Sequence, residues 1–159
     1  MSVFDVMKKL KLLDWYTLLV GLERGWCEKG SLISYCEDII NRQATCGEID
    51  NDLISIIAEK NIAINDLIAM VVQFLKKNKK PMLQEEKNEA IEKWRLAHLD
   101  WLLQMNWSEQ EKIDALQELY AQFGFPSDMA ACSIYSRDKI DPLVATVHVV
   151  EKLSRQFCE

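Results

Sequence analysis

The sequence has little of the chemistry that enzymes and metalloproteins share. Its 159 residues include two histidines and five glycines, and no segment carries a G-x-S-x-G nucleophile elbow or a phosphate-binding glycine loop. A helical metal site would require Glu-x-x-His or His-x-x-x-His, but Trp94 and Arg95 stand at those positions ahead of His98. Only a catalytic triad assembled by tertiary folding would leave no such local pattern. Because all of these local motifs are missing, we expect no catalytic residue, no metal, no cofactor and a protein that is not an enzyme.

Long hydrophobic runs are also absent. The longest strongly apolar stretch, Leu67 to Leu75, is far shorter than the ~20 residues that cross a bilayer. The first residues, Met1 to Lys11, interrupt their apolar positions with Asp5 and three lysines, unlike a secretory signal. We expect a cytoplasmic protein that does not contact membranes.

Cysteine usage argues against an oxidised framework. The five cysteines are odd in number, and no two form a C-x-x-C pair, whereas disulfide scaffolds and zinc sites use paired, closely spaced cysteines. We expect free and mostly buried thiols, with redox sensing as the alternative.

Helix signals recur along the whole chain, and no stretch shows the sustained period-two pattern of strands. Asp14 and Gly25 predict a helix from Trp15 to Arg24, Ser108 and Glu111 form a capping box, and Asp141-Pro142 is typical of a helix start. Other helices are expected to begin at Ser31, at Asp50 or Asn51, at Asn65 or Asp66 and near Leu83. The sequence predicts an all-α fold of about seven or eight helices, packed as antiparallel helical hairpins around one core.

The length is typical of one domain, here residues 1–159, which would bury roughly 70 % of the surface of its unfolded chain. The segment Lys76–Pro81 holds four lysines and a proline, and it reads as a hinge between sub-halves 1–80 and 81–159. The helix ahead of this hinge is apolar nearly all round, so we expect it to be central.

The two histidines have two interpretations each. His98 lies on the apolar stripe of the long helix beside tryptophans, where an imidazole is either a tuned acid or base or a hydrogen-bonded core residue. His148, between two valines of the last helix, is open to the same alternatives. Packing is the interpretation that the surrounding residues favour for both.

Charge is more informative than chemistry. The net charge is -6 and the isoelectric point about 5.0, and the acidic residues gather in segments 23–52 and 82–122 on either side of the lysine hinge. Direct binding of nucleic acid is disfavoured, because affinity for phosphates depends on clustered cations. A solvated, solubilising surface is one interpretation of the acidic segments, and a docking surface for a basic protein is the other.

Three stretches resemble a family of small acidic, all-helical bacterial proteins associated with toxin immunity of the contact-dependent growth inhibition type. They are Trp15 to Trp26 leading into Ile33 and Tyr35, then Leu119 to Met129, and then Asp141-Pro142-Leu143. The resemblance implies an immunity protein that binds a cognate toxin C-terminal domain, commonly a basic nuclease such as an RNase, and occludes its cationic active-site or substrate surface. The alternative is a general helical adaptor module without a toxin partner.

Under this resemblance the partner-binding residues would be carboxylates of the two acidic segments. These are Glu37, Asp38, Glu48, Asp50, Asp52, Glu85, Glu86, Glu89 and Glu92. Trp26, Tyr35 or Trp107 would serve either as an aromatic anchor in the partner or as core residues. The sequence leaves open the toxin's reaction, the surface that binds it, active-site plugging against exosite binding, and the oligomeric state.

Overall fold

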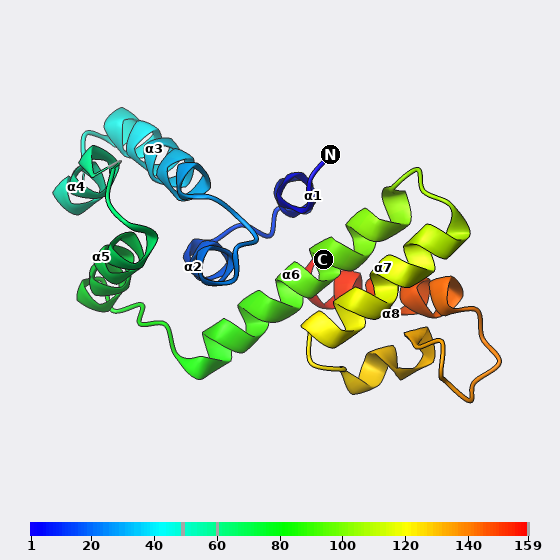
Figure 1. Ribbon diagram of the computed structural model, residues 1–159. Coiled ribbons are helices and arrows are strands. Elements are labelled where there is room, and N and C mark those ends of the chain that lie inside the picture. Colours follow the sequence, from blue (N-terminus) through cyan, green and yellow to red (C-terminus); the bar gives the residue numbers. More distant parts are fainter. Residues whose placement is uncertain (49, 60, 159) are drawn as a thin grey trace. The chain divides into compact units, whose positions relative to one another are not determined.

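The computed structural model describes residues 1–48, 50–59 and 61–158, and within these ranges it contains helices and no strand (Figure 1). The prediction of an all-α fold is confirmed. Eight α-helices and one 3-10 helix, η1, follow one another along the described residues: α1 Val3–Lys9, α2 Trp15–Arg24, α3 Lys29–Cys46, α4 Asn51–Ala58, α5 Ile64–Lys77, α6 Gln84–Gln104, α7 Glu109–Gln122, η1 Ser127–Cys132 and α8 Pro142–Phe157.

The chain divides into two compact units. Unit 1 consists of Met1–Leu13 and Ile91–Glu159, and unit 2 consists of Asp14–Ala90. The boundary after Ala90 lies inside α6, whereas the sub-halves expected from sequence meet at residues 80 and 81. The lysine hinge marks the end of a helix, whereas each unit is defined by the residues that pack together within it, so the two divisions differ.

Helix α2 shows how local sequence sets the bounds of an element in unit 2. The Asp14 carboxylate accepts a hydrogen bond from the Thr17 amide at 2.8 Å, and the Thr17 hydroxyl accepts one from the Asp14 amide at 2.8 Å. Gly25 ends the helix in the left-handed region at φ +73°. Both ends are those predicted from sequence. Six successive buried residues between them, Thr17 to Leu22, place α2 in the core of unit 2.

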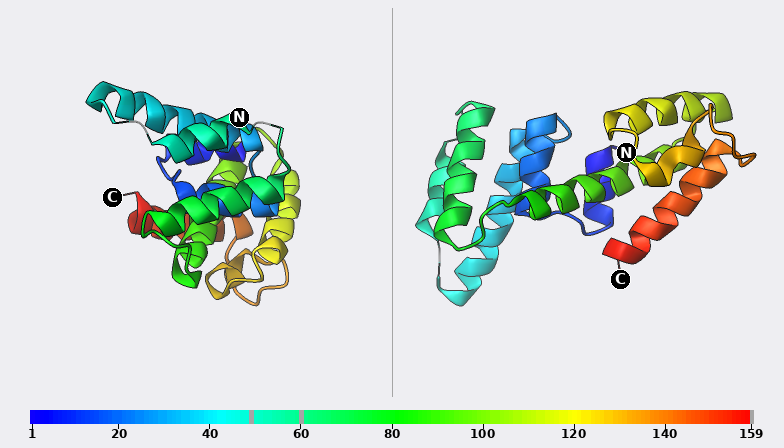
Figure 2. Two further views of the ribbon diagram at one scale, coloured as in Figure 1. Left: turned by 90° about the vertical axis from the view of Figure 1, so that its left-hand side faces the viewer. Right: turned by 90° about the horizontal axis from the view of Figure 1, so that it is seen from below.

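Helices α3, α4 and α5 complete unit 2, with α4 beside both α3 and α5 and with α5 also against α2 (Figure 1, Figure 2). The expected start of α3 at Ser31 is wrong, since the helix begins at Lys29 after Glu28 without a side-chain cap. Helix α5 is not buried all round either. It buries one stripe, Leu67, Val71 and Leu75, and exposes Ala69 and Gln73 on another face.

Unit 1 is built around the C-terminal part of α6. Every residue from Trp94 to Leu99 is buried, including the charged Arg95 at 3 % exposure. Helix α1 begins with a capping box between Ser2 and Asp5 and buries Val6 and Met7 completely. The Trp101 Nε1–H group donates to the Met1 carbonyl oxygen at 3.0 Å, so the two segments of the chain that form this unit are in direct contact.

The remaining elements of unit 1 are α7, η1 and α8. Ser108 and Glu111 form the predicted capping box at the start of α7, and the Asp141 carboxylate caps α8 with Pro142 at its first position. Between them η1 lies against both helices and buries Met129 and Cys132. No described helix in ranges 1–48, 50–59 and 61–158 has the length and apolarity needed to span a bilayer.

The histidines differ in their surroundings. His98 is 7 % exposed, and its Nδ1 lies 2.8 Å from the Trp94 carbonyl oxygen, so it is the hydrogen-bonded core residue that packing predicted. Burial lowers its pKa, and the bond to the carbonyl only partly counters that effect. His148 is exposed on α8, so the expectation that it packs in the core is wrong; neighbouring valines in a sequence do not fix the helix face.

The five cysteines are free, in agreement with the sequence. Only Cys36 and Cys132 are buried, while Cys27 is half-buried and Cys46 and Cys158 are exposed, so the expectation of mostly buried thiols is wrong. Cys46 is the last residue of α3 and Cys158 follows the end of α8, positions where a helix leaves its packed face.

Candidate functional site

The nine carboxylates expected to bind a partner fall into two groups in the structure. Five of them are exposed, and none of the five makes a side-chain hydrogen bond or ion pair with any residue in ranges 1–48, 50–59 and 61–158. We call these five the open carboxylates: Glu37 and Asp38 on α3, Glu48 just beyond it, and Glu85 and Glu89 in the first turns of α6. All five belong to unit 2.

The other four carboxylates are half-buried, and three of them have structural roles. Asp50 caps α4 by accepting from the Asp52 amide at 2.9 Å, and Asp52 pairs with Lys77 of α5, whose Nζ is 2.9 Å from Oδ2. Glu86 is half-buried. Glu92 binds Arg95 one helical turn later. The sequence therefore placed acidic surface and acidic structural residues in a single set, which the structure separates.

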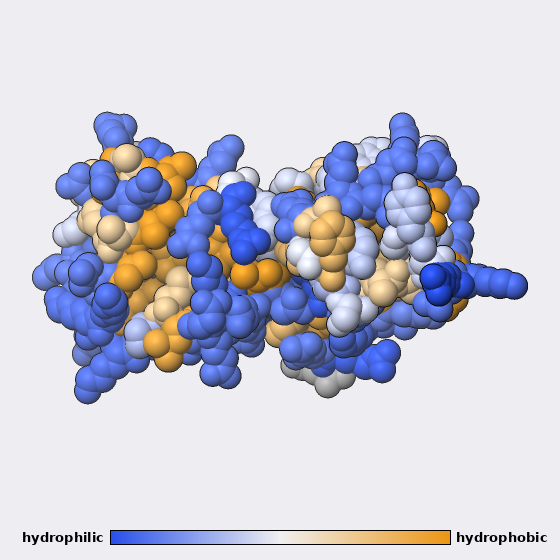
Figure 3. Space-filling view, turned by 60° about the horizontal axis from the view of Figure 1, so that its bottom comes forward, coloured by the Kyte–Doolittle hydropathy of each residue, from blue (hydrophilic) through white to orange (hydrophobic). Residues whose placement is uncertain are grey.

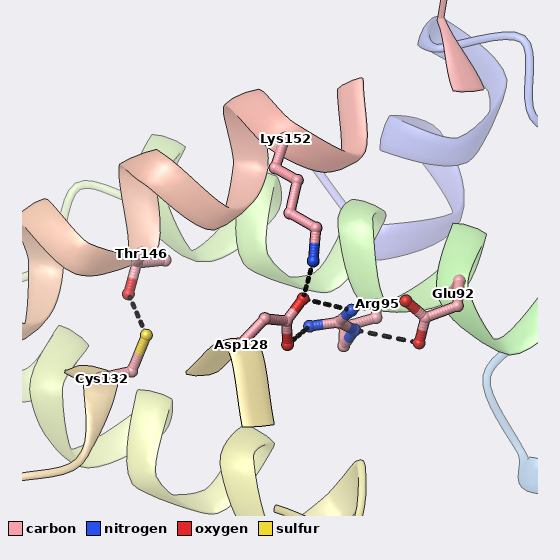
Figure 4. A network of polar contacts seen from close by, with 6 residues as sticks. All are labelled: Glu92, Arg95, Asp128, Cys132, Thr146 and Lys152. Atoms are coloured by element: carbon pink, nitrogen blue, oxygen red, sulfur yellow. Dashed lines mark hydrogen bonds and ion pairs between the residues drawn. The ribbon is translucent and has the colours of Figure 1, made fainter. Parts of the chain in front are cut away.

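Glu92 belongs to a polar network inside unit 1 (Figure 4). The buried guanidinium of Arg95 donates to both oxygens of Asp128, at 2.7 and 2.9 Å, and to Glu92. The ammonium of Lys152 lies 3.0 Å from Asp128 Oδ2. Burial alone would raise the pKa of Asp128, but the hydrogen bonds from Arg95 and Lys152 outweigh it and lower the pKa below 3.8. This network connects α6, η1 and α8, so the charge of Glu92 is used within the fold of unit 1.

The lysine cluster Lys76–Lys80 is exposed. One of its members is paired with Asp52, and the Lys80 carbonyl accepts a hydrogen bond from the Tyr16 hydroxyl at 3.2 Å. Unit 2 as a whole still carries thirteen acidic and nine basic residues. Unit 2 therefore has a net negative charge in spite of the cluster.

Several hollows open on the described part of unit 2, and two of them contain aromatic side chains. One is a groove of about 450 Å³ between α4 and α5, lined by Ile56, Met70 and Phe74 with the Asp52–Lys77 pair beside them. Apolar side chains gather over this unit, at the left of the space-filling view (Figure 3). Half of the residues that line the groove are apolar, and the other half are polar or charged.

The second hollow, which we call the aromatic pocket, has a volume of about 550 Å³ and receives residues from α2, α3, α4 and α5. Trp15 is its central ring, with its centroid 5.0 Å from that of Tyr35 in an edge-to-face arrangement and 5.4 Å from that of Phe74. Asp14 and Asp50 also line it. Burial raises the pKa of Tyr35, and the negative charge of Asp14 raises it further.

The three candidate aromatic anchors have different positions. Tyr35 lines the aromatic pocket and is half-buried. Trp26 lies under the guanidinium of Arg24, 5.4 Å from its ring centroid. Trp107 stacks edge-to-face on Trp101 at 5.3 Å, within unit 1. Of the three, Tyr35 alone lies in the same hollow as one of the nine predicted carboxylates, Asp50.

Trp15, Tyr16 and Phe74 line the pocket although no pattern in the sequence groups them. Asp14-Trp15-Tyr16 has a helix cap followed by two aromatic residues, a pattern that could have drawn attention to the start of α2. In the described part of the chain no three His, Cys, Asp or Glu side chains are arranged to hold a metal ion. What unit 2 offers is carboxylates beside aromatic rings, and that chemistry attracts cations.

The fold and this surface define a small helical protein that presents carboxylates and aromatic rings on unit 2. Residues 4–156 match the family model described as an uncharacterized protein conserved in bacteria (DUF2247), and the chain belongs to that family. No curated protein and no solved structure matches the chain.

Proposed function

We propose that this protein is an immunity protein, which binds a cognate toxin C-terminal domain, a basic nuclease such as an RNase, and blocks its cationic active-site or substrate surface. The observation that carries the proposal is the set of open carboxylates, Glu37, Asp38, Glu48, Glu85 and Glu89, which no basic residue of the described chain neutralises. A protein surface that leaves so many like charges without partners loses some stability to self-repulsion and gains speed and selectivity in meeting a cationic protein.

The proposal requires no turnover, and inhibition follows from occupying the substrate's place. A nuclease must present a positive surface to the phosphate backbone, so a negative protein surface competes with its substrate for the same groups. Glu85 and Glu89 stand one helical turn apart on α6 and so face the same side. Each can meet a separate cation of the partner.

The direct test is rescue. Cells that express the C-terminal domain of the toxin encoded beside this gene should survive when this protein is co-expressed, and the two purified proteins should form a complex of fixed stoichiometry. A gene with no toxin gene as neighbour, together with a housekeeping protein as the stable partner, would favour the adaptor alternative instead.

Charge reversal tests the surface. Replacing Glu37, Asp38 and Glu48 with lysine should slow association with the toxin domain about tenfold at low salt and flatten the dependence of the rate on salt. Asp50 and Asp52 are left unchanged, because the cap and the ion pair that they form would be lost. The matched control reverses Glu109, Asp114 and Glu118 on α7, which should leave the rate within about twofold. Equal slowing by both triple variants would mean that only net charge matters and would contradict the assignment to unit 2.

A further inference from the structure

We propose that the aromatic pocket of unit 2 binds an arginine side chain of the protein partner. For the source of the arginine this inference rests on the proposed function, while binding of a guanidinium group by the pocket can be tested without any toxin. The pocket is the larger of the two hollows described above, and its volume of about 550 Å³ lies within the range usual for ligand sites.

The rings supply one half of the recognition. Trp15, Tyr35 and Phe74 come from three helices. The ring centroid of Tyr35 lies 5.0 Å from that of Trp15, and the ring centroid of Phe74 lies 5.4 Å from it. Each of the three side chains is only half-buried, so ring surface remains open to solvent in the hollow. A guanidinium is planar and weakly hydrated, which makes it the cationic side chain best suited to lie against such rings.

The carboxylates supply the other half. Asp14 and Asp50 line the pocket, against one ammonium group, that of Lys80. Oδ1 of Asp50 accepts from the Asp52 amide, while Oδ2 has no hydrogen-bond partner within residues 1–48, 50–59 and 61–158. The Tyr35 hydroxyl likewise has no partner in that part of the chain. Both oxygens can accept from the five N–H groups of a guanidinium.

Arginine fits better than the other occupants considered. An anionic side chain would meet two carboxylates, and a purely apolar side chain would leave the Asp50 and Tyr35 oxygens without partners, which costs affinity. Lysine offers a point charge and cannot lie flat on an indole ring. The α4–α5 groove, in contrast, has an acid already neutralised by Lys77 and carries no comparable demand for a cation.

The experiment titrates the ¹⁵N-labelled protein with N-acetyl-arginine amide and follows the indole N–H signal of Trp15, assigned with the Trp15→Phe variant. N-acetyl-citrulline amide, nearly the same shape without charge, is the matched control ligand. We expect saturable shifts with the arginine compound, a dissociation constant on the order of 1 mM, and no saturation with the citrulline compound. Equal shifts with both compounds, or none that saturate, would overturn the inference.

Two variants separate the pocket from general charge. Asp50→Asn keeps a good helix cap and should weaken binding of the arginine compound about fivefold. Asp66→Asn, at an exposed position of α5, removes the same charge outside the pocket and should leave binding unchanged. Equal weakening by the two variants would also overturn the inference. If this protein rescues cells but the Trp15 signal does not respond to the arginine compound, the pocket assignment is wrong and the proposed function stands. If the Trp15 signal responds but cells are not rescued, the pocket assignment stands and the proposed function is wrong.

Discussion

The network around Arg95 allows a quantitative test of what holds unit 1 together. The change is Asp128→Asn, which keeps the shape of the side chain and removes its charge. Arg95 is 3 % exposed and donates to both oxygens of Asp128, whose side chain is 20 % exposed. The amide group of asparagine offers one acceptor in place of two and presents an NH₂ group to the guanidinium.

The magnitude follows from these contacts. Breaking a fully buried ion pair by removing one partner costs about 3–5 kcal/mol. Here Glu92 still binds Arg95, one acceptor remains and Asp128 is partly solvated, so we expect a loss of about 2 kcal/mol in the free energy of unfolding. Lys152→Met should cost less than about 1 kcal/mol, because the lysine side chain is 60 % exposed.

The assay is equilibrium unfolding in urea, with Asp138→Asn as the control at an exposed aspartate of the same unit. Asp128 has a pKa below its ordinary value of 3.8 in the folded protein, so its contribution is complete above the unfolded-state pKa and is lost as pH falls through the folded-state pKa. The difference in free energy of unfolding between the natural chain and Asp128→Asn should therefore be constant from pH 7 to about pH 5 and shrink below about pH 4. A difference no larger than that of the control, or one that grows on acidification, would refute the reasoning.

A pair of glycine substitutions and the reactivity of the cysteines test the local structure further. Gly25→Ala should lower the free energy of unfolding by about 1 kcal/mol because Gly25 has φ +73°, while Gly30→Ala, inside α3 with open space around the added methyl group, should raise it by about 0.5 kcal/mol in the same urea assay. With a colorimetric thiol reagent near neutral pH, the exposed Cys46 and Cys158 should react fast and the other three cysteines slowly. Cys36 and Cys132 are buried, and burial raises the pKa of Cys27 and of Cys36 to about 12. Rapid reaction of all five thiols would contradict this reasoning.

Helix ends were predictable because the residues that determine them are neighbours in the chain. The cap at Asp14, the glycine at 25, the box from Ser108 to Glu111 and the pair Asp141-Pro142 each act within four residues, and the structure confirms all of them. The start of α3 was predicted wrongly because no capping side chain marks it. Ser31 has a side chain suited to capping, but the helix begins two residues earlier, at Lys29, without a side-chain capping bond.

The candidate site was harder to predict from the sequence, because the residues that meet there are far apart in the chain. Asp128 is 33 residues from Arg95, and no local pattern marks that arginine as buried. Trp15, Tyr35 and Phe74 meet only after α2, α3 and α5 have packed. The acidic character of the segments was clear from composition, but the separation of Glu37 and Asp38, which stay open, from Asp50 and Asp52, which cap and pair, depends on tertiary structure.

The division of the chain has a consequence for biosynthesis. Unit 2 is an unbroken stretch, whereas α1 has to join segments that begin at residue 91, and the hydrogen bond from Trp101 to Met1 spans 100 residues. At ordinary rates of translation α1 waits on the order of 10 s on the ribosome for its partners. During that interval Val6 and Met7, which are fully buried in the folded protein, have no partners to pack against, so the nascent N-terminal segment exposes apolar surface of the kind that chaperones bind.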